Sequence, residues 1–196
     1  MSLPAALAFL READKLKSIL RQTRVTFDPD RRENDAEHSW HLALMAFVLA
    51  GHAPAGVDLL AVVRMVLVHD LVEIDAGDTF LYDDAHAVSK HDRELAAADR
   101  LFGMLDEPLR GELRGAWDEF EAGTTPAARF ARAIDRIQPV LQNLYTDGAS
   151  WRAHGITAPQ VRAKNGPPIR DGAPDLWPHL DAMLEDAIAS GMLARG

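Results

Sequence analysis

The chain contains no cysteine among its 196 residues. That absence excludes a disulfide framework, a thiolate zinc site, an iron–sulfur cluster and a cysteine nucleophile. Long apolar runs are also missing, because the longest, residues 42–50, has only half of the roughly 18 residues that a membrane span needs. The N-terminal residues lack the basic start and extended apolar stretch of a signal peptide. These absences predict a cytoplasmic protein without a membrane partner.

Positive charge is scarce as well. Lys and Arg total 21 against 30 Asp and Glu, which gives a formal net charge of −9. An acidic chain disfavours nucleic acids and anionic membranes as partners, although a local group of arginines still permits a small phosphorylated ligand. The 47% of hydrophobic residues and the chain length predict one domain whose core needs no cross-links.

Helical periodicity dominates the sequence, and no stretch alternates convincingly between polar and apolar residues. We therefore expect an all-α fold, a single domain over residues 1–196 built as a bundle of six to eight helices. The expected helices span about 4–22, 34–51, 57–75, 89–105, 108–122, 126–145 and 177–193, with a short one after Thr157. Two polar stretches that contain proline, residues 23–34 and 165–174, are expected to be loops.

The expected helix at 57–75 combines an apolar body with a charged end. It is apolar nearly all round, which predicts a central, buried helix. Yet it ends in the ionisable residues His69, Asp70, Glu73 and Asp75, whose burial needs a compensating partner. His69 and Glu73, four residues apart, share a helix face. A divalent cation is the natural partner for such a group.

Two further segments offer metal ligands. His38 and His41 lie early in the helix expected from residue 34, and we expect His41 to lie behind a ligand or in the core. Asp135 stands among apolar residues, four positions before Pro139, which has no N–H for the Asp135 carbonyl. The sequence therefore predicts a helix kink beside Asp135. Imidazoles and carboxylates together suit Mn²⁺, Co²⁺, Fe²⁺, Zn²⁺ or Mg²⁺.

The order His38, then His69-Asp70, then Asp135 resembles the metal-dependent phosphohydrolases of the HD-domain superfamily. The segments Arg-Glu-Asn-Asp-Ala-Glu-His-Ser (32–39) and Val-His-Asp-Leu-Val-Glu-Ile-Asp-Ala-Gly-Asp (68–78) are similar to its bacterial 5′-deoxynucleotidase branch. The resemblance covers roughly residues 10–150 and implies an HD-domain helical bundle. We expect the loop and helix of residues 151–196 to pack on that core.

The resemblance also implies roles for individual residues. One divalent metal ion would be held by His38, His69, Asp70 and Asp135. Glu73 matches the glutamate that orients or deprotonates the attacking water, and Asp78 matches a second acidic residue near the substrate. Arg21 matches a nucleotide-binding arginine, but Arg24 or Val25 stands where that branch has an aromatic residue. A homodimer is implied by the same resemblance.

The predicted function is removal of phosphate from a small phosphomonoester, a (deoxy)nucleoside 5′-monophosphate, by metal-activated water. Candidates to neutralise the phosphate are Arg21, Arg24, Arg31, Arg32 and Lys90. One alternative is hydrolysis of another nucleotide, a triphosphate or an alarmone. A second is a non-catalytic, metal-containing ligand-binding or regulatory module, against which Glu73 argues. His86 and His91 could supply a second metal, but we expect exposed histidines there.

Overall fold

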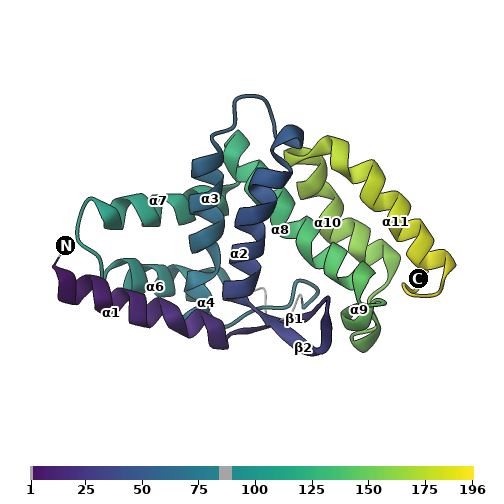
Figure 1. Cartoon of the computed structure of the whole chain (residues 1–196), viewed down its shortest axis with the longest axis horizontal. Helices are drawn as coiled ribbons and strands as arrows, with labels where there is room; N and C mark the ends of the chain where they lie inside the picture. Colours follow the sequence, from purple (N-terminus) through teal and green to yellow (C-terminus); the bar gives the residue numbers. More distant parts are fainter. Residues whose placement is uncertain (1, 84–89) are drawn as a thin grey trace.

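The computed structural model describes residues 2–83 and 90–196 (Figure 1). Helices dominate it and confirm the expected all-α class. Eight helices of ten or more residues lie in the described part: α1 (Leu3–Ala13), α2 (Asp35–Val48), α3 (Leu59–Val68), α6 (Lys90–Phe102), α7 (Leu109–Ala122), α8 (Pro126–Tyr145), α10 (Ala158–Gly172) and α11 (Trp177–Ala189). Shorter elements are α4 (Glu73–Ala76), α9 (Ala149–Ala153), and the 3₁₀ turns η1 (Asp14–Ser18), η2 (Ala50–His52), η3 (His69–Val72) and η4 (Pro174–Leu176).

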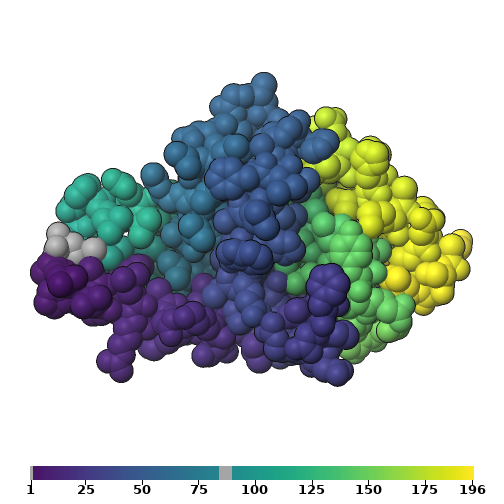
Figure 2. Space-filling model, viewed as in Figure 1, coloured from purple at the N-terminus to yellow at the C-terminus, as the bar shows by residue number. Residues whose placement is uncertain are grey.

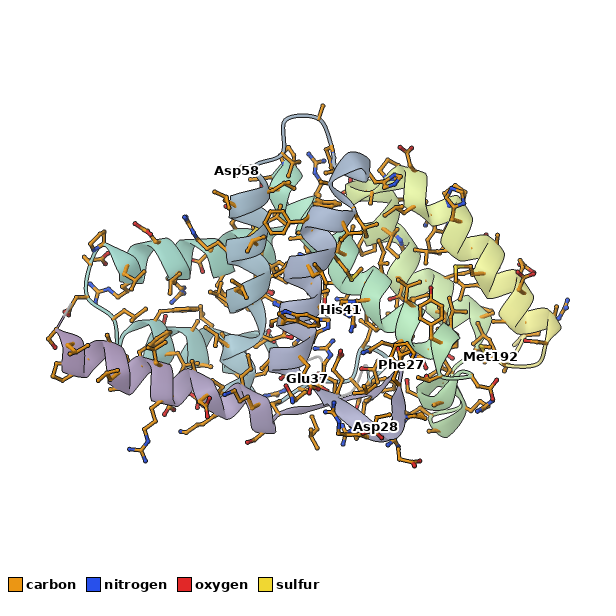
Figure 3. The ribbon with its side chains drawn as sticks, in the orientation of Figure 1. Phe27, Asp28, Glu37, His41, Asp58 and Met192 are labelled. Carbon is orange, nitrogen blue, oxygen red and sulfur yellow. The ribbon has the colours of Figure 1, made fainter. Side chains whose placement is uncertain are left out.

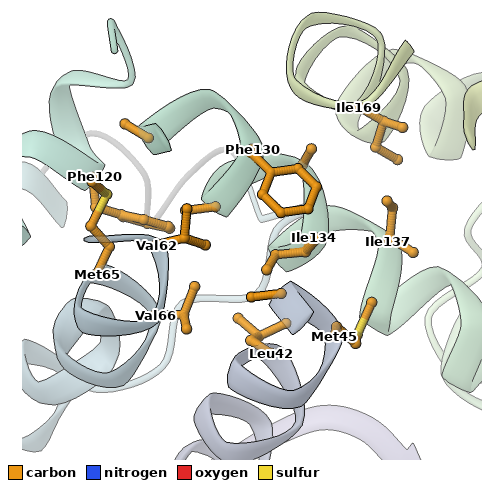
Figure 4. Packing of buried hydrophobic residues seen from close by; sticks show 14 of the residues in the cluster. Leu42, Met45, Val62, Met65, Val66, Phe120, Phe130, Ile134, Ile137 and Ile169 are labelled. Atoms are coloured by element: carbon orange, nitrogen blue, oxygen red, sulfur yellow. The ribbon is translucent and has the colours of Figure 1, made fainter. Parts of the chain in front are cut away.

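Helices α2, α3 and α8 form the centre of the molecule (Figure 1). Their inward side chains are fully buried, and Figure 4 shows Leu42, Val62, Val66, Phe130 and Ile134 packed together. Helices α6 and α7 lie on one side of this centre, and α10 and α11 on the other. Among residues 2–83 and 90–196, no helix is both long and apolar enough to cross a membrane.

Side-chain caps fix where two central helices begin. Asn34 and Glu37 form a capping box at α2, in which the Glu37 N–H donates to Asn34 Oδ1 at 3.0 Å. Thr125 Oγ1 accepts from the Ala128 N–H at 3.1 Å at the start of α8. Both starts agree with the expected ones. They place His38 in the first turn of α2 and Asp135 in the middle of α8.

The expected helix at 4–22 and loop at 23–34 are wrong. The first helix ends at Ala13, and a two-stranded antiparallel hairpin follows, β1 (Leu20–Val25) and β2 (Asp28–Asn34). The guanidinium of Arg32 bridges the strands, because it donates to the carbonyls of Leu20, at 2.7 Å, and Arg21. Polar side chains hold this hairpin, so the sequence shows no alternating apolar pattern.

The continuous helix expected at 57–75 is broken. Helix α3 ends at Val68 and passes through η3 into α4. The break coincides with a side-chain contact, since His69 Nδ1 donates to the Val66 carbonyl at 2.9 Å. The expectation of burial all round is also wrong, because Leu60 and Leu67 are 68% and 48% exposed.

The loop expected at 165–174 is a helix up to Gly172. Helix α10 continues through Pro167 and Pro168 and packs along α8. A Cβ at Gly172 would lie 2.0 Å from the carbonyl oxygen of Arg129 on α8, so the two backbones approach closely there. Packing against α8 therefore outweighs the local cost of the prolines.

Candidate metal centre and active site

Three separate elements bring the four predicted metal ligands together. His38 comes from α2, His69 and Asp70 from η3, and Asp135 from α8, and all four are buried. Asp135 Oδ1 lies 3.0 Å from His38 Nε2 and 3.8 Å from His69 Nε2. Asp70 Oδ1 lies 3.1 Å from His69 Nε2, and Asp70 Oδ2 lies 3.9 Å from His38 Nε2. We call these four residues the histidine–aspartate cluster.

The donor chemistry of this cluster fits a divalent metal. His38 Nδ1 lies 3.0 Å from Gln138 Oε1, and His69 Nδ1 lies 2.9 Å from the Val66 carbonyl. Carbonyl oxygens only accept, so both Nδ1 atoms carry a hydrogen and both Nε2 atoms are the ones that face the carboxylates. His69 Nε2 is buried without a hydrogen-bond partner. Two ring nitrogens and two carboxylates that converge in this way fit a divalent cation, to which the Nε2 lone pairs would bind.

Charge balance keeps the carboxylates of this cluster ionised. Burial alone would raise the pKa of Asp135, but Arg136, His38 and His69 hold that pKa well below its usual range. Burial acts against ionisation of Asp70 too, and the charges of His69 and Arg21 outweigh it and lower the pKa. Ionised carboxylates are the form that binds a metal.

A second group, the carboxylate cluster, consists of Asp35, Glu73 and Asp78. One oxygen from each lies within 4.8 Å of the others. Asp35 Oδ2 and Glu73 Oε2 are buried without hydrogen-bond partners. Burial, then the Asp70 carboxylate, raises the pKa of Asp35 to about 7, and the same causes raise the pKa of Glu73 well above its usual value. Asp35 therefore exchanges its proton near neutral pH.

Arg21 connects the two clusters. Its Nη1 donates to Asp70 Oδ2 at 3.0 Å and to Asp35 Oδ1 at 3.4 Å. Burial opposes its charge, but Asp70 and Asp78 raise the pKa of Arg21 further, so it stays protonated. Within the described residues, Arg21 Nη2 makes no hydrogen bond, which leaves it able to donate to a ligand.

Members of both clusters line a cavity of about 410 Å³: His69, Asp70 and Asp135 of the first, and Glu73 and Asp78 of the second. Its far wall carries Phe80, Tyr82 and Trp151. Asn165 of α10 fixes this wall, since its Nδ2 donates to Tyr82 Oη at 3.1 Å and to the Val161 carbonyl at 2.8 Å. The cavity therefore has a charged end at the two clusters and an aromatic, polar end between the 80–82 segment and α9–α10.

The profile of the HD domain family matches residues 13–177. The chain belongs to the HD-domain family. A crystal structure of a predicted metal-dependent phosphohydrolase from Magnetospirillum magnetotacticum MS-1 is 49% identical to this HD domain, with a TM-score of 0.92 over 98% of this chain and 95% of that one. The resemblance seen in the sequence is confirmed.

Curated relatives carry the name 5′-deoxynucleotidase HDDC2. The Homo sapiens protein is 32% identical over 136 residues, which are 69% of this chain and 65% of that protein. The Mus musculus protein is 31% identical over 136 residues, 69% of this chain and 67% of that protein. The HD domain described here thus spans about two thirds of the length of these relatives.

The predicted substrate-binding residues separate into two groups. Arg21 and Lys90 line the cavity, and Lys90 Nζ lies 3.2 Å from Glu94 Oε1. Arg24 donates to the Asp30 carbonyl at 3.0 Å, and Arg32 is bonded within the hairpin. Neither lines the cavity, and their contact with substrate stays a prediction without support from this geometry.

The suggested second histidine pair is placed only in part. His91 is an exposed residue of α6 at the cavity edge, whereas His86 lies outside the described residues. His41 lies behind His38, with Nδ1 3.5 Å from Gln138 Nε2, and Figure 3 shows it between α2 and α8.

Sequence reasoning missed several residues of this site. Asp35 and Glu33 stand inside the 32–39 segment, and Gln138 follows Asp135 by three positions, so the spacing to the predicted ligands was an available signal. For Asn165 the sequence offered no such signal, because residues 165–174 are expected to form a loop. Its place in the cavity wall depends on the packing of α10 on α8.

Proposed function

We propose that this HD domain is a metal-dependent phosphohydrolase that removes phosphate from nucleoside 5′-monophosphates. One observation carries the proposal: His69, Asp70 and Asp135 of the histidine–aspartate cluster line the same cavity as buried Glu73. The names of the similar proteins, 5′-deoxynucleotidase and metal-dependent phosphohydrolase, support it.

The residues that would hold the metal are His38, His69, Asp70 and Asp135. When bound, a divalent ion supplies charge that lowers the pKa of water and polarises a phosphoryl oxygen. Two neutral imidazoles and two carboxylates suit Mn²⁺, Co²⁺, Fe²⁺, Zn²⁺ and Mg²⁺ alike, and the ion used is left to experiment.

Glu73 is the proposed general base. Burial and the Asp70 carboxylate raise its pKa well above the usual value, which makes the Glu73 carboxylate a stronger base. The water oxygen forms a bond to phosphorus while its proton passes to a Glu73 oxygen. The bond between phosphorus and the alcohol oxygen breaks, and that oxygen takes a proton from the carboxylate cluster, for which Asp78 is the proposed donor.

Cationic side chains at the charged end of the cavity hold the phosphate. Arg21 offers its Nη2 hydrogens, and Lys90 adds an ammonium group at the rim. Arg136, whose Nε lies 3.8 Å from Asp135 Oδ2, lines the same end. These three groups balance a monoester dianion in a site that is otherwise rich in carboxylates.

The cavity favours a mononucleotide over a triphosphate. A volume of about 410 Å³ lies at the small end of ordinary ligand sites. Its lining includes the acidic residues Asp70, Glu73, Asp78, Asp83, Glu94, Glu121 and Asp135, which repel additional phosphates. The aromatic, polar end suits a nucleoside as the leaving group.

Phosphate release by metal-stripped protein resupplied with Mn²⁺, Co²⁺, Zn²⁺ or Mg²⁺ tests the proposal. The panel contains deoxyribonucleoside and ribonucleoside monophosphates and one triphosphate. We expect metal-restored release from monophosphates. No release from any monophosphate with any ion, or release from the triphosphate alone, contradicts the proposal.

We also propose that two copies of this chain associate through an apolar face on α2 and α3, which pack side by side at the centre of the view in Figure 2. The members of this face are 46–71% exposed: Trp40, Leu44, Phe47, Val48, Leu60 and Leu67. Their exposed apolar side chains are gathered on two helices that pack against each other, and grouping of this kind marks a protein–protein contact site.

Molar mass by light scattering tests the dimer. Phe47→Glu places a charge in the apolar face and is expected to give monomers. Phe27→Glu is the matched control, because Phe27 is 99% exposed at the hairpin tip, away from that face. A wild-type monomer, or a dimer that survives Phe47→Glu, contradicts this interface.

A further inference from the structure

Glu33 of β2 is a buried carboxylate that anchors two side chains of α8. Its Oε1 accepts from Gln138 Nε2 at 2.7 Å and from Gln142 Nε2 at 2.6 Å. Glu33 and Gln138 are 3% and 0% exposed, so water does not compete for these bonds. Neither Glu33 nor Gln138 has a part in the proposed reaction.

The carboxylate determines how the Gln138 amide is oriented. Glu33 Oε1 accepts from the amide nitrogen of Gln138, so that nitrogen faces β2. The amide oxygen then faces His38 Nδ1 at 3.0 Å, and this contact requires a hydrogen on Nδ1. His38 Nε2 is left on the side of Asp135 and Asp70, where a metal would bind.

We propose that Glu33, acting through Gln138, selects the tautomer of His38 and holds its ring in the position that binds the metal. The inference rests on the metal site of the proposed function. Glu33 does not reach the histidine itself, because its Oε2 lies 3.7 Å from His38 Nδ1 without a hydrogen bond. Gln138 is therefore the necessary link.

The two metal-site histidines differ in how they are held. His69 donates to a backbone carbonyl, that of Val66, which no side-chain substitution removes. His38 donates to a side chain that a buried negative charge polarises, and such an outer partner makes a histidine a better ligand. Gln138 stands three residues after Asp135, so one face of α8 supplies both a metal ligand and the group that positions another.

Gln142 makes it possible to distinguish a positioning role of Glu33 from a purely structural one. It donates to the same Glu33 oxygen from the next turn of α8, and it has no contact with His38. If Glu33 only tied the hairpin to α8, its role would depend on Gln142 as much as on Gln138. If Glu33 positions His38, its effect on metal binding depends on Gln138 alone.

Metal affinity of the stripped full-length chain tests the inference, with Co²⁺ as the calorimetric probe. Gln138→Met is expected to weaken Co²⁺ binding about 10- to 100-fold, the usual effect of losing an outer partner. Gln142→Met, the matched control, is expected to stay within about threefold. Equal weakening in both variants, or none in Gln138→Met, overturns the inference.

Imidazole ¹⁵N NMR of the metal-free protein gives a second readout that a structural brace would not change. We expect His38 Nδ1 to carry a hydrogen in the wild type and in Gln142→Met, and to carry it only in part of the molecules in Gln138→Met. A wild type in which Nδ1 carries no hydrogen overturns the inference. If these results appear but no phosphomonoester is hydrolysed, the proposed function fails and the inference stands.

Discussion

The histidine–aspartate cluster and the carboxylate cluster are neighbours with opposite electrostatic character. Both are largely buried, and both are bonded to Arg21. His38, His69 and Asp135 of the first offer ligand atoms within 4.8 Å of one another, as do the three carboxylates of the second. Yet the pKa values of Asp70 and Asp135 are lowered, whereas those of Asp35, Glu73 and Asp78 are raised.

Asp135 and Asp35 show why the two clusters differ. Burial opposes the charge of both side chains. Asp135 has Arg136 and two histidines beside it, so it stays ionised. Asp35 faces Asp70, and Arg21 compensates only in part, so its pKa rises to about 7. Neighbouring charge, more than burial, therefore separates the residues suited to a metal from those suited to a proton.

The largest expected effect follows from removing a metal ligand. Asp135→Ala should lower metal affinity by more than about 10³-fold, beyond the 10–100-fold typical of an outer partner, and should reduce phosphate release to the metal-free background. Calorimetry and a release assay check both. Asp75→Ala, at an exposed aspartate paired with Arg100, is the control. Normal affinity in Asp135→Ala would mean that the metal binds elsewhere.

A smaller effect is expected in the carboxylate cluster. Glu73→Gln keeps the shape of the side chain but removes the base, so kcat should fall by about 10²- to 10⁴-fold. Metal affinity should change by only a few-fold, measured by the same calorimetry. Loss of metal affinity together with kcat in Glu73→Gln would contradict the separate roles of the two clusters.

Substitution of the connecting arginine should act mainly on substrate binding. Arg21→Met removes a phosphate-binding group, and KM for a mononucleotide should rise about tenfold or more. Arg24→Met, in the same strand but outside the cavity, should leave KM unchanged. Steady-state kinetics measure KM for both variants, and an equal rise of KM in both contradicts the role of Arg21 in phosphate binding.

The smallest expected effect concerns stability and pH. The pKa of Asp35 is about 7 in the folded chain against an ordinary value of 3.8, so the folded state holds this proton longer. The metal-free protein therefore loses stability as pH rises from about 4 to 7. Asp35→Asn does not titrate, so its Tm advantage over wild type should grow across that window and level off above it. A constant difference from pH 4 to 8 contradicts the raised pKa.

The sequence was informative where a residue pattern and a local structure coincide. Helix starts at Asn34 and Thr125 follow from capping chemistry, and the four predicted metal ligands follow from the resemblance of their order along the chain to the HD-domain family. The structure brings these four side chains together.

The sequence was uninformative where packing decides the structure. The β1–β2 hairpin is polar and is held by Arg32 and by the buried Glu33, so no periodicity marks it. Helix α10 continues through Pro167 and Pro168 because it packs on α8, and only that packing brings Asn165 to the cavity. No sequence signal joins Asp35 to the carboxylate cluster, since its neighbours Asp70 and Asp78 are distant in sequence.

Anomalous diffraction from crystals grown with Mn²⁺ tests the contrast between the two clusters most directly. The expected result is a strong anomalous peak bounded by His38, His69, Asp70 and Asp135. A peak confined to Asp35, Glu73 and Asp78, with none between the histidines, would contradict the assignment of metal and base.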